Sequence, residues 1–291
     1  MCYDLVTSFH EEGHSVTRSC QTLEVSQSGY YSYLKTKLQP SNSLKKKRHD
    51  KVLEIFHNHK GRYGRVRVKK EFDKSGESIS EASISKIMKK NDLTARKKKP
   101  FRPQTTQQSG AAKFKPNLMS ELSEAELESK SLHVTVADIT YIPTREGWLY
   151  LAGVMDLKTK YIKGYETSSS LHTDLPLSAL RKHLAHYTKG QRLIHHTDRG
   201  CQYTSKAYQD ELQQWHCESS MSGKGYCYDN AAMESFWSTL KTEFLPDSGI
   251  FETRAEADRA IFEYIESYYN TQRMHSSIGY QTPLEAEQNV A

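Results

Sequence analysis

The chain has 291 residues, of which 36% are hydrophobic and 26% charged, so it is long enough to bury a core in one to three domains. No apolar run approaches the length of a membrane span, and no signal-peptide core follows the N-terminus, which argues against membrane and secreted classes. Free thiols in a reducing compartment are the simplest interpretation of five cysteines without CxxC spacing: Cys2, Cys20, Cys201, Cys217 and Cys227. We therefore expect a soluble, cytoplasmic protein.

Charge is distributed unevenly along the chain. Residues 1–115 contain 25 Lys and Arg against 11 Asp and Glu, a net charge of +14, whereas residues 116–291 contain 16 against 24, a net charge of −8. A basic front half and an acidic rear half are typical of a DNA-binding module joined to a metal-dependent catalytic module. The alternative is that the basic residues only maintain solubility, but their clustering argues against it.

The first predicted domain, residues 1–40, has the pattern of a helix-turn-helix. A short helix over residues 16–23 is followed by Ser26, a suitable N-cap for a second helix over residues 27–37. The inner face of that second helix would carry Tyr30, Tyr31 and Leu34. Many helical pairs share this pattern, so it does not establish DNA binding by itself.

A second helix-turn-helix-like module is predicted over residues 41–95. One helix spans residues 44–59, and Ser80 caps another over residues 81–90. The inner face of this last helix would carry Ile84, Ile87 and Met88, and its outer face Lys86, Lys89 and Lys90. Such a lysine face suits a DNA groove or backbone, although a purely solvated face is nearly as good an interpretation of the helix alone.

Residues 96–130 are predicted to form a linker. Its first part is basic and broken by proline, which suits an extended segment along a DNA backbone. Candidate phosphate contacts there are Lys97, Lys98 and Lys99. The acidic residues 120–130 form either a short helix or a surface loop.

From residue 131 the sequence pattern changes to that of an α/β catalytic domain, residues 131–291, which ends in a C-terminal helical tail. Strands are predicted over residues 132–143, 148–157, 160–166, 192–196 and 216–220. Helices are predicted over residues 174–187, 205–215, 229–244 and 253–270. The order βββαβαβα is that of the ribonuclease-H-like fold, whose mixed sheet places the first and fourth strands side by side.

Three carboxylates stand out in this domain: Asp138, Asp198 and Glu234. Asp138 lies among apolar strand residues, where a carboxylate is costly to bury unless it is paired or bound to a metal. Asp198 ends the fourth strand, and Glu234 follows on a helix after 234 − 198 − 1 = 35 intervening residues. Each acid alone has an ordinary explanation, as a turn residue or a surface glutamate. Together they predict a catalytic site for two divalent cations, Mg²⁺ or Mn²⁺, acting on a phosphodiester.

Other candidate sites are weaker. His195 and His196 are adjacent on a strand and point to opposite faces, so at most one could approach a metal. The histidines at positions 10 and 14 close no zinc-finger pattern. Residues 222–225 lack the spacing of a phosphate-binding loop and are predicted to be a loop beside the active site.

Several segments carry a specific family pattern. They are VADITYI at 136–142, HTDRGCQY at 196–203, DNAAMESF at 229–236 and YNTQRMHSSIGY at 269–280, with further matches at 25–31, 62–64, 240–243 and 282–283. The chain resembles bacterial insertion-sequence transposases with a retroviral-integrase-type DDE core, in particular those encoded by the second of two overlapping reading frames. This resemblance covers nearly the entire chain. It departs from the family at Thr135, where Trp is common, and at Tyr226, where Asn is common.

The resemblance implies a function and residue roles. Asp138 and Asp198 would bind one ion, and Asp138 with Glu234 the other, for cleavage that frees a 3′-OH and for its attack on a second phosphodiester. Asn230 and Lys241 share the helical face of Glu234, and the resemblance makes Asn230 an orienting residue and Lys241 a contact to the terminal DNA. Further candidate DNA contacts are Arg199, Arg273 and His275, although packing explains the last two equally well.

The partners implied are double-stranded DNA, further copies of the chain assembled on paired ends, and an upstream-frame product, either separate or fused. Two other functions remain open. One is a non-catalytic DNA-binding regulator that uses only the front half, and the other is a hydrolytic nuclease of the same fold, which would nick DNA without joining it.

Overall fold

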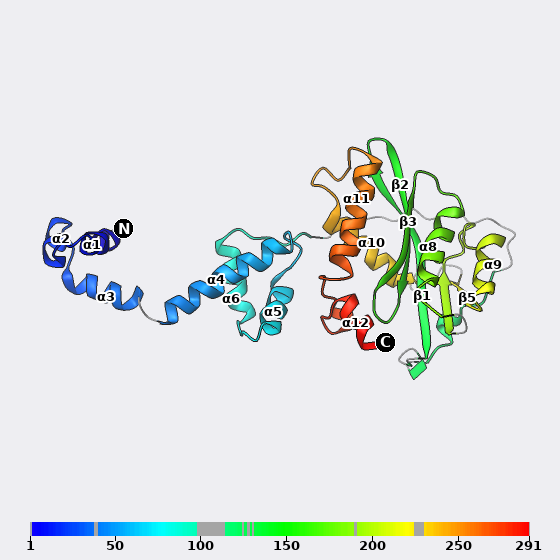
Figure 1. The fold of residues 1–291 in the computed structure, drawn as a ribbon, viewed down its shortest axis with the longest axis horizontal. Helices are drawn as coiled ribbons and strands as arrows, with labels where there is room; N and C mark the ends of the chain where they lie inside the picture. The colour runs from blue at the N-terminus through cyan, green and yellow to red at the C-terminus, as the bar shows by residue number, and fades with distance from the viewer. Residues whose placement is uncertain are drawn as a thin grey trace. The chain divides into compact units, whose positions relative to one another are not determined.

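The computed structural model describes residues 2–37, 40–97, 114–123, 125–126, 129, 131–188, 191–223 and 230–290 (Figure 1). By its internal contacts the chain divides into two compact units, Met1–Ala95 and Arg96–Ala291. The predicted boundary at residue 40 and the extent of the linker stay predictions. Lys98 and Lys99 lie outside the described residues.

The N-terminal helices are α1 (Cys2–Glu11), α2 (Val16–Thr22) and α3 (Gln27–Lys37). Helices α2 and α3 match the prediction, whereas α1 was not predicted. These helices enclose a small core of Val6, Cys20 and Tyr30. The inward position predicted for Tyr31 is wrong, because its side chain is 56% exposed. The ring of Tyr33 instead stacks on Tyr3, so the inner face of α3 starts at Tyr30 and continues three and four residues later.

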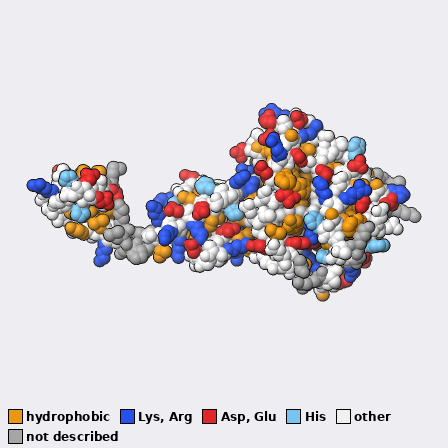
Figure 2. Space-filling view, viewed as in Figure 1, with side chains coloured by type: hydrophobic (Ala, Val, Ile, Leu, Met, Phe, Trp, Pro, Cys, Tyr) orange, Lys and Arg blue, Asp and Glu red, His pale blue; other side chains and the backbone are white. Residues whose placement is uncertain are grey.

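The second part of this unit consists of α4 (Pro40–Asn58), α5 (Arg65–Lys74) and α6 (Glu81–Lys90). The predicted N-cap is confirmed, since the Ser80 hydroxyl accepts a hydrogen bond from the amide of Ser83 at 3.2 Å. Ile84 and Met88 are buried, and the three predicted lysines, Lys86, Lys89 and Lys90, are exposed. Figure 2 shows Lys and Arg side chains interspersed with acidic ones over this part of the chain.

A mixed five-stranded sheet in the order β3-β2-β1-β4-β5 forms the centre of the C-terminal unit. Its strands are β1 (Leu132–Thr144), β2 (Gly147–Asp156), β3 (Ile162–Ser168), β4 (Arg192–Thr197) and β5 (Glu218–Met221). Strand β1 pairs antiparallel with β2 and parallel with β4, so the predicted adjacency of the first and fourth strands is confirmed.

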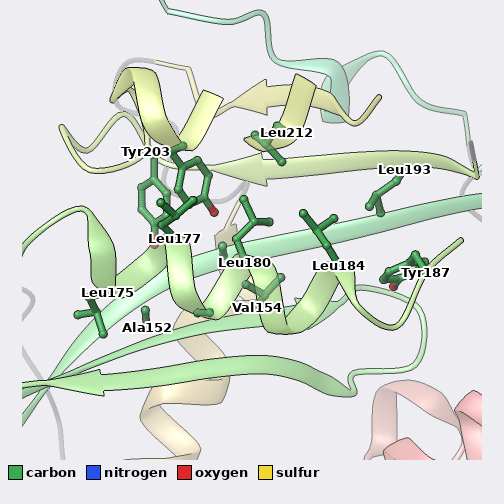
Figure 3. Packing of buried hydrophobic residues seen from close by; sticks show 13 residues of the cluster. Ala152, Val154, Leu175, Leu177, Leu180, Leu184, Tyr187, Leu193, Tyr203 and Leu212 are labelled. Atoms are coloured by element: carbon green, nitrogen blue, oxygen red, sulfur yellow. The ribbon is translucent and has the colours of Figure 1, made fainter. Parts of the chain in front are cut away.

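Helices cover both faces of this sheet. On one face α8 (Asp174–Leu184) and α9 (Lys206–Gln214) bury an apolar cluster that includes Leu180, Leu193 and Leu212 (Figure 3). Figure 1 shows α10 (Ala231–Phe244) and α11 (Arg254–Tyr264) on the opposite side. Because Ala137 belongs to the apolar cluster and successive strand residues alternate, Asp138 faces α10.

The end of the chain differs from its predicted form. The helix predicted over residues 253–270 is α-helical over Arg254–Tyr264 and continues directly as a π-helix, Ile265–Tyr269. A 3₁₀ turn, Ser276–Ile278, follows. The last helix, α12 (Pro283–Val290), lies in the predicted C-terminal helical tail, although its bounds were not predicted. Its signal was present, because Thr282 and Glu285 form a reciprocal capping box around a proline at the first helical position. A short 3₁₀ turn, Leu118–Ser120, precedes the sheet. Among the helices described here, none is long and apolar enough to cross a membrane.

Candidate active site

Asp138 lies near the middle of β1, directly opposite Gly153 of β2. One carboxylate oxygen, Oδ1, accepts a hydrogen bond from the backbone amide of Ile139 at 2.8 Å. The other, Oδ2, accepts one from the indole Nε1 of Trp237 on α10 at 3.0 Å. The side chain is therefore held at both oxygens and directed toward α10.

Asp198 is the first residue after β4. The parallel ladder between β1 and β4 pairs Val136 with His196, and two further residues along each strand place Asp198 opposite Asp138. Neighbouring strands lie about 4.8 Å apart, and both aspartates follow the same alternation toward one face. The backbone amide of Gly200 donates to Asp198 Oδ1 at 2.9 Å, which orients this second carboxylate.

The charges of the acids act on one another. The pKa of Asp138 is raised to about 7, first by burial and next by the negative charge of Asp198, while the hydrogen bonds from Ile139 and Trp237 oppose the rise. The charge of Glu234 also raises this pKa. Burial raises the pKa of Asp198, and the amide of Gly200 opposes that shift. Positive charge placed between these carboxylates would relieve both repulsion and desolvation.

Glu234 lies in the first turn of α10 and its side chain is exposed. Helix α10 meets β1 on either side of it, because Asn230 Nδ2 donates to the carbonyl of Ala137 at 3.4 Å and Trp237 donates to Asp138. Nevertheless, among the described residues no group of three or more His, Cys, Asp or Glu is close enough together to hold a metal ion. The acids thus share one region without forming a closed ligand cage.

The donors around this region suit a divalent cation. Within the described parts of the chain, Asn230 Oδ1 and Tyr203 Oη are buried without a hydrogen-bond partner. Burial raises the pKa of Tyr203 well above its usual range, and the charges of Asp138 and Asp198 contribute, so this hydroxyl lies near both aspartates. Carboxylate and amide carbonyl oxygens are hard ligands of the kind that Mg²⁺ and Mn²⁺ prefer. The residues present therefore fit such an ion.

Two predicted DNA contacts lie in this neighbourhood. Lys241, two turns after Glu234 on α10, is half-buried; burial lowers its pKa while the charge of Asp138 raises it, so the ammonium lies near that aspartate. Arg199 instead packs locally, because its Nε donates to the carbonyl of Ser222 at 2.7 Å and its guanidinium lies 4.4 Å from the ring centre of Phe114. Contact of either residue with DNA stays a prediction.

Comparison with known proteins identifies the family. Residues 128–227 and 216–283 match models of the integrase core domain, and residues 43–101 match an HTH-like domain. The chain is 42% identical over 238 residues to the transposase for insertion sequence element IS904 of Lactococcus lactis subsp. lactis (strain IL1403), covering 82% of this chain and 92% of that protein. It is 32% identical over 280 residues to transposase InsF for insertion sequence IS3A of Escherichia coli (strain K12), covering 96% of each. The chain belongs to the insertion-sequence transposases.

This transposase has DNA as its partner, and polynucleotidyl transfer is the chemistry of its family. The ribonuclease-H-like fold predicted from the element order is confirmed by the integrase core match and by the sheet. Among solved structures, the trimeric form of the HTLV-2 integrase catalytic core domain in complex with magnesium is similar, with a TM-score of 0.42 and 16% identity. That match covers 53% of this chain and 95% of that one.

Two further predicted DNA contacts of the transposase, Arg273 and His275, lie near the end of the chain. Arg273 is only 5% exposed, and its Nη2 and Nε donate to Glu243 of α10 at 2.8–3.1 Å. The packing alternative therefore accounts for the position of Arg273, because its guanidinium neutralises a carboxylate buried with it, and its contact with DNA stays a prediction. His275 is half-buried, edge-on to Tyr269 and 3.2 Å from Arg273 Nη1, so packing accounts for its position as well.

The two histidines of the fourth strand use their ring nitrogens in hydrogen bonds and not as metal ligands. His195 is hydrogen-bonded to Tyr208 and Thr135, and His196 to Ser220 and Ser222. Both are fully buried, and burial lowers the pKa of His195 to about 3, so it is neutral. The sequence interpretation missed Trp237, although its place three residues after Glu234 on a helix indicates the same face.

Proposed function

We propose that Asp138, Asp198 and Glu234 are the catalytic carboxylates with which this transposase cuts the ends of its element and joins them to target DNA. The observation that carries the proposal is geometric: the register between β1 and β4 brings Asp198 beside Asp138, and hydrogen bonds from Asn230 and Trp237 hold the helix of Glu234 against β1. These residues come from a central strand, the end of its parallel neighbour and a helix that packs against the central strand. Placing acids near one another is costly because of their repulsion, unless cations are bound there.

The donor set supports two divalent cations, Mg²⁺ or Mn²⁺. Asp138 and Asp198 would hold one, and Asp138 with Glu234 the other. Bound in this way, the ions would activate the attacking oxygen and stabilise the leaving oxygen. Attack by water breaks a P–O bond at the element end and frees a 3′-OH, whose attack on a target phosphodiester exchanges one P–O bond for another.

The chain's own residues prepare this site. The amide of Ile139 and the indole of Trp237 hold the carboxylate of Asp138 in one orientation. Asn230 ties the start of α10 to β1, which keeps Glu234 over the strand. The ammonium of Lys241 supplies positive charge beside the acids, where it could contact a phosphate of the terminal DNA.

DNA binding would extend to the first unit. One side of α6 is exposed and carries Lys86, Lys89 and Lys90, and Lys97 is exposed after the end of this helix. All four lie within residues 43–101, the segment that matches an HTH-like domain. Two ends and a target must be held together for joining, which favours a homo-multimer on paired ends. An upstream-frame product would act in that complex as a partner or a fusion.

The test uses the full chain with a mini-element that carries its native ends, in Mg²⁺ or Mn²⁺, and scores cleavage and joining separately. Asp138→Asn, Asp198→Asn and Glu234→Gln should each abolish both steps while binding to the ends survives. Glu263→Gln, an exposed carboxylate on the neighbouring α11, is the matched control and should keep both.

Full activity in the Asp138 or Glu234 variant would refute the assignment. Nicking without joining by the unsubstituted protein would indicate a hydrolytic nuclease instead. Binding to the ends with neither reaction would indicate a regulator.

A further inference from the structure

Trp237 occupies a slot next to Asp138, and this slot exists because the facing residue of β2 is a glycine. Gly153 is the cross-strand partner of Asp138, and a β-carbon at that position would lie 2.8 Å from Cη2 of Trp237 and 3.3 Å from the terminal methyl of Met233. Real β-carbons essentially never approach other atoms as closely as the first of these distances. The indole therefore approaches the backbone of β2 this closely only because residue 153 is glycine.

From this slot the indole reaches the carboxylate. Trp237 is 6% exposed, and its Nε1 donates to Asp138 Oδ2 at 3.0 Å. An indole N–H is a donor only, and burial strongly favours its pairing with an acceptor. Since the ring is fixed between α10 and β2, the direction of this hydrogen bond is fixed as well.

The bond leaves the carboxylate able to bind a cation. Each oxygen of an ionised carboxylate has two lone-pair directions. The Ile139 amide uses one on Oδ1 and the indole uses one on Oδ2, so each oxygen keeps another for a ligand. Groups that orient a metal ligand in this way typically change metal affinity or activity by about 10- to 100-fold when they are lost.

We propose that Trp237 is a positioning residue of the metal site: seated in the slot at Gly153, it holds Asp138 for divalent cations and fixes α10, with Glu234, at that carboxylate. This inference rests on the proposed function of the three acids. A packing role alone is the competing explanation, because Trp237 also contacts the ring of Phe236 at 4.7 Å between centroids. Packing depends on the ring, whereas positioning depends on the N–H.

The experiment, done on the full chain, distinguishes the contribution of the aromatic ring of Trp237 from that of its indole N–H. Trp237→Phe keeps an aromatic ring and removes the donor, and Mn²⁺ affinity is measured by calorimetry without DNA. We expect affinity to fall about tenfold, with kcat for joining reduced and KM for the element ends unchanged. Gly153→Ala should weaken Mn²⁺ binding as well, since the new β-carbon displaces the indole. Trp148→Phe, at a side chain 54% exposed, is the control and should behave like the unsubstituted protein.

A second readout keeps Trp237 in place, in case its replacement disturbs folding. The chain contains three tryptophans, so Trp148→Phe with Trp215→Phe leaves Trp237 as the single fluorophore. Its emission should be quenched by Mn²⁺ in a saturable manner, and adding Asp138→Asn should abolish this response.

The outcomes distinguish the two proposals. Unchanged Mn²⁺ affinity in a folded Trp237→Phe variant, or quenching that persists with Asp138→Asn, would overturn the role of Trp237. If Asp138→Asn and Glu234→Gln are inactive at the same time, the catalytic assignment still stands. An active Asp138→Asn variant would instead remove the catalytic assignment itself.

Discussion

Asp138 and Asp198 are 198 − 138 = 60 positions apart, the same offset as every pair in the ladder between β1 and β4, such as Leu132 with Arg192, 192 − 132 = 60. The parallel register therefore brings the two carboxylates to the same height and the same face of the sheet. A slip of one residue would turn one of them to the opposite face. Strand pairing therefore brings the two aspartates together.

This convergence predicts that the metal-free protein is destabilised by its own site. The folded-state pKa of Asp138 is about 7 against an ordinary value of 3.8, so the fold favours the protonated form. Stability from this group is therefore greatest at low pH and is lost as pH rises from about 4 to about 7. Asp138→Asn should stabilise the protein in EDTA at pH 8 by about 1 to 2 kcal/mol, less than the full shift implies because the side chain is partly exposed.

Thermal melts in EDTA at pH 5 and pH 8 measure this effect, and the gain should be smaller at pH 5. Adding Mn²⁺ at pH 8 should then raise the melting temperature of the unsubstituted protein but not of the variant, because a ligand stabilises the state that binds it. An Asp138→Asn variant no more stable than its parent at pH 8 would contradict the electrostatic account.

Much of this site could be predicted from local signals. Asp138 stands out because a carboxylate interrupts an apolar strand, and Asp198 because a strand ends in a glycine-containing turn. The element order then implies that the two strands are neighbours. The cap at Ser80 was equally readable, since it depends only on residues three apart.

Features that depend on contacts between residues far apart in the chain could not be predicted from the sequence. Arg273 resembles a DNA contact until Glu243, 30 positions away, is found buried against it. Trp237 is an ordinary core residue until its neighbour across the helix–sheet interface is known to be Gly153. The inner face of α3 was assigned to Tyr31 instead of Tyr33, because a short helix with three tyrosines fits more than one phase.

The buried ion pair between Arg273 and Glu243 predicts a large stability effect. Removing one partner leaves a buried charge uncompensated, so Arg273→Met or Glu243→Gln should each lower the free energy of unfolding by about 3 to 5 kcal/mol. The hydroxyl of Tyr264 also donates to Glu243 at 2.9 Å, and it would lose its charged acceptor in the second variant. Urea denaturation of the full chain measures the loss.

A surface pair provides the control for that measurement. Arg192 and Glu218 pair at 3.3 Å with side chains about half exposed, so Arg192→Gln should cost less than about 1 kcal/mol. The double variant Arg273→Met with Glu243→Met should recover part of the loss, because it removes both charges. Equal, small effects at the buried and surface pairs would show that Arg273 is not needed for the fold, and a DNA contact would have to be reconsidered.

The hydroxyl of Tyr203 predicts opposite effects on stability and activity. Within the described residues it is buried without a partner, so Tyr203→Phe should leave the stability unchanged or raise it by up to about 1 kcal/mol. Because the same hydroxyl lies near Asp138 and Asp198, its loss should reduce joining of ends in Mg²⁺. Parallel melts and joining assays test both parts, and a variant that is less stable but fully active would contradict them.

The exposed lysines of α6 predict a specific change in salt dependence. If Lys86, Lys89 and Lys90 each contact a phosphate, replacing all three with Gln should reduce the slope of log affinity against log salt by about 2.7 units. Binding to the element ends is measured between about 50 and 200 mM salt, because affinity that depends on phosphate contacts falls steeply over this range. Lys182→Gln with Lys206→Gln, on exposed lysines of the catalytic unit, is the control and should leave the slope unchanged. An unchanged slope in the triple variant would mean that this side of α6 is only a solvated surface, and that the contacts to the element ends lie elsewhere.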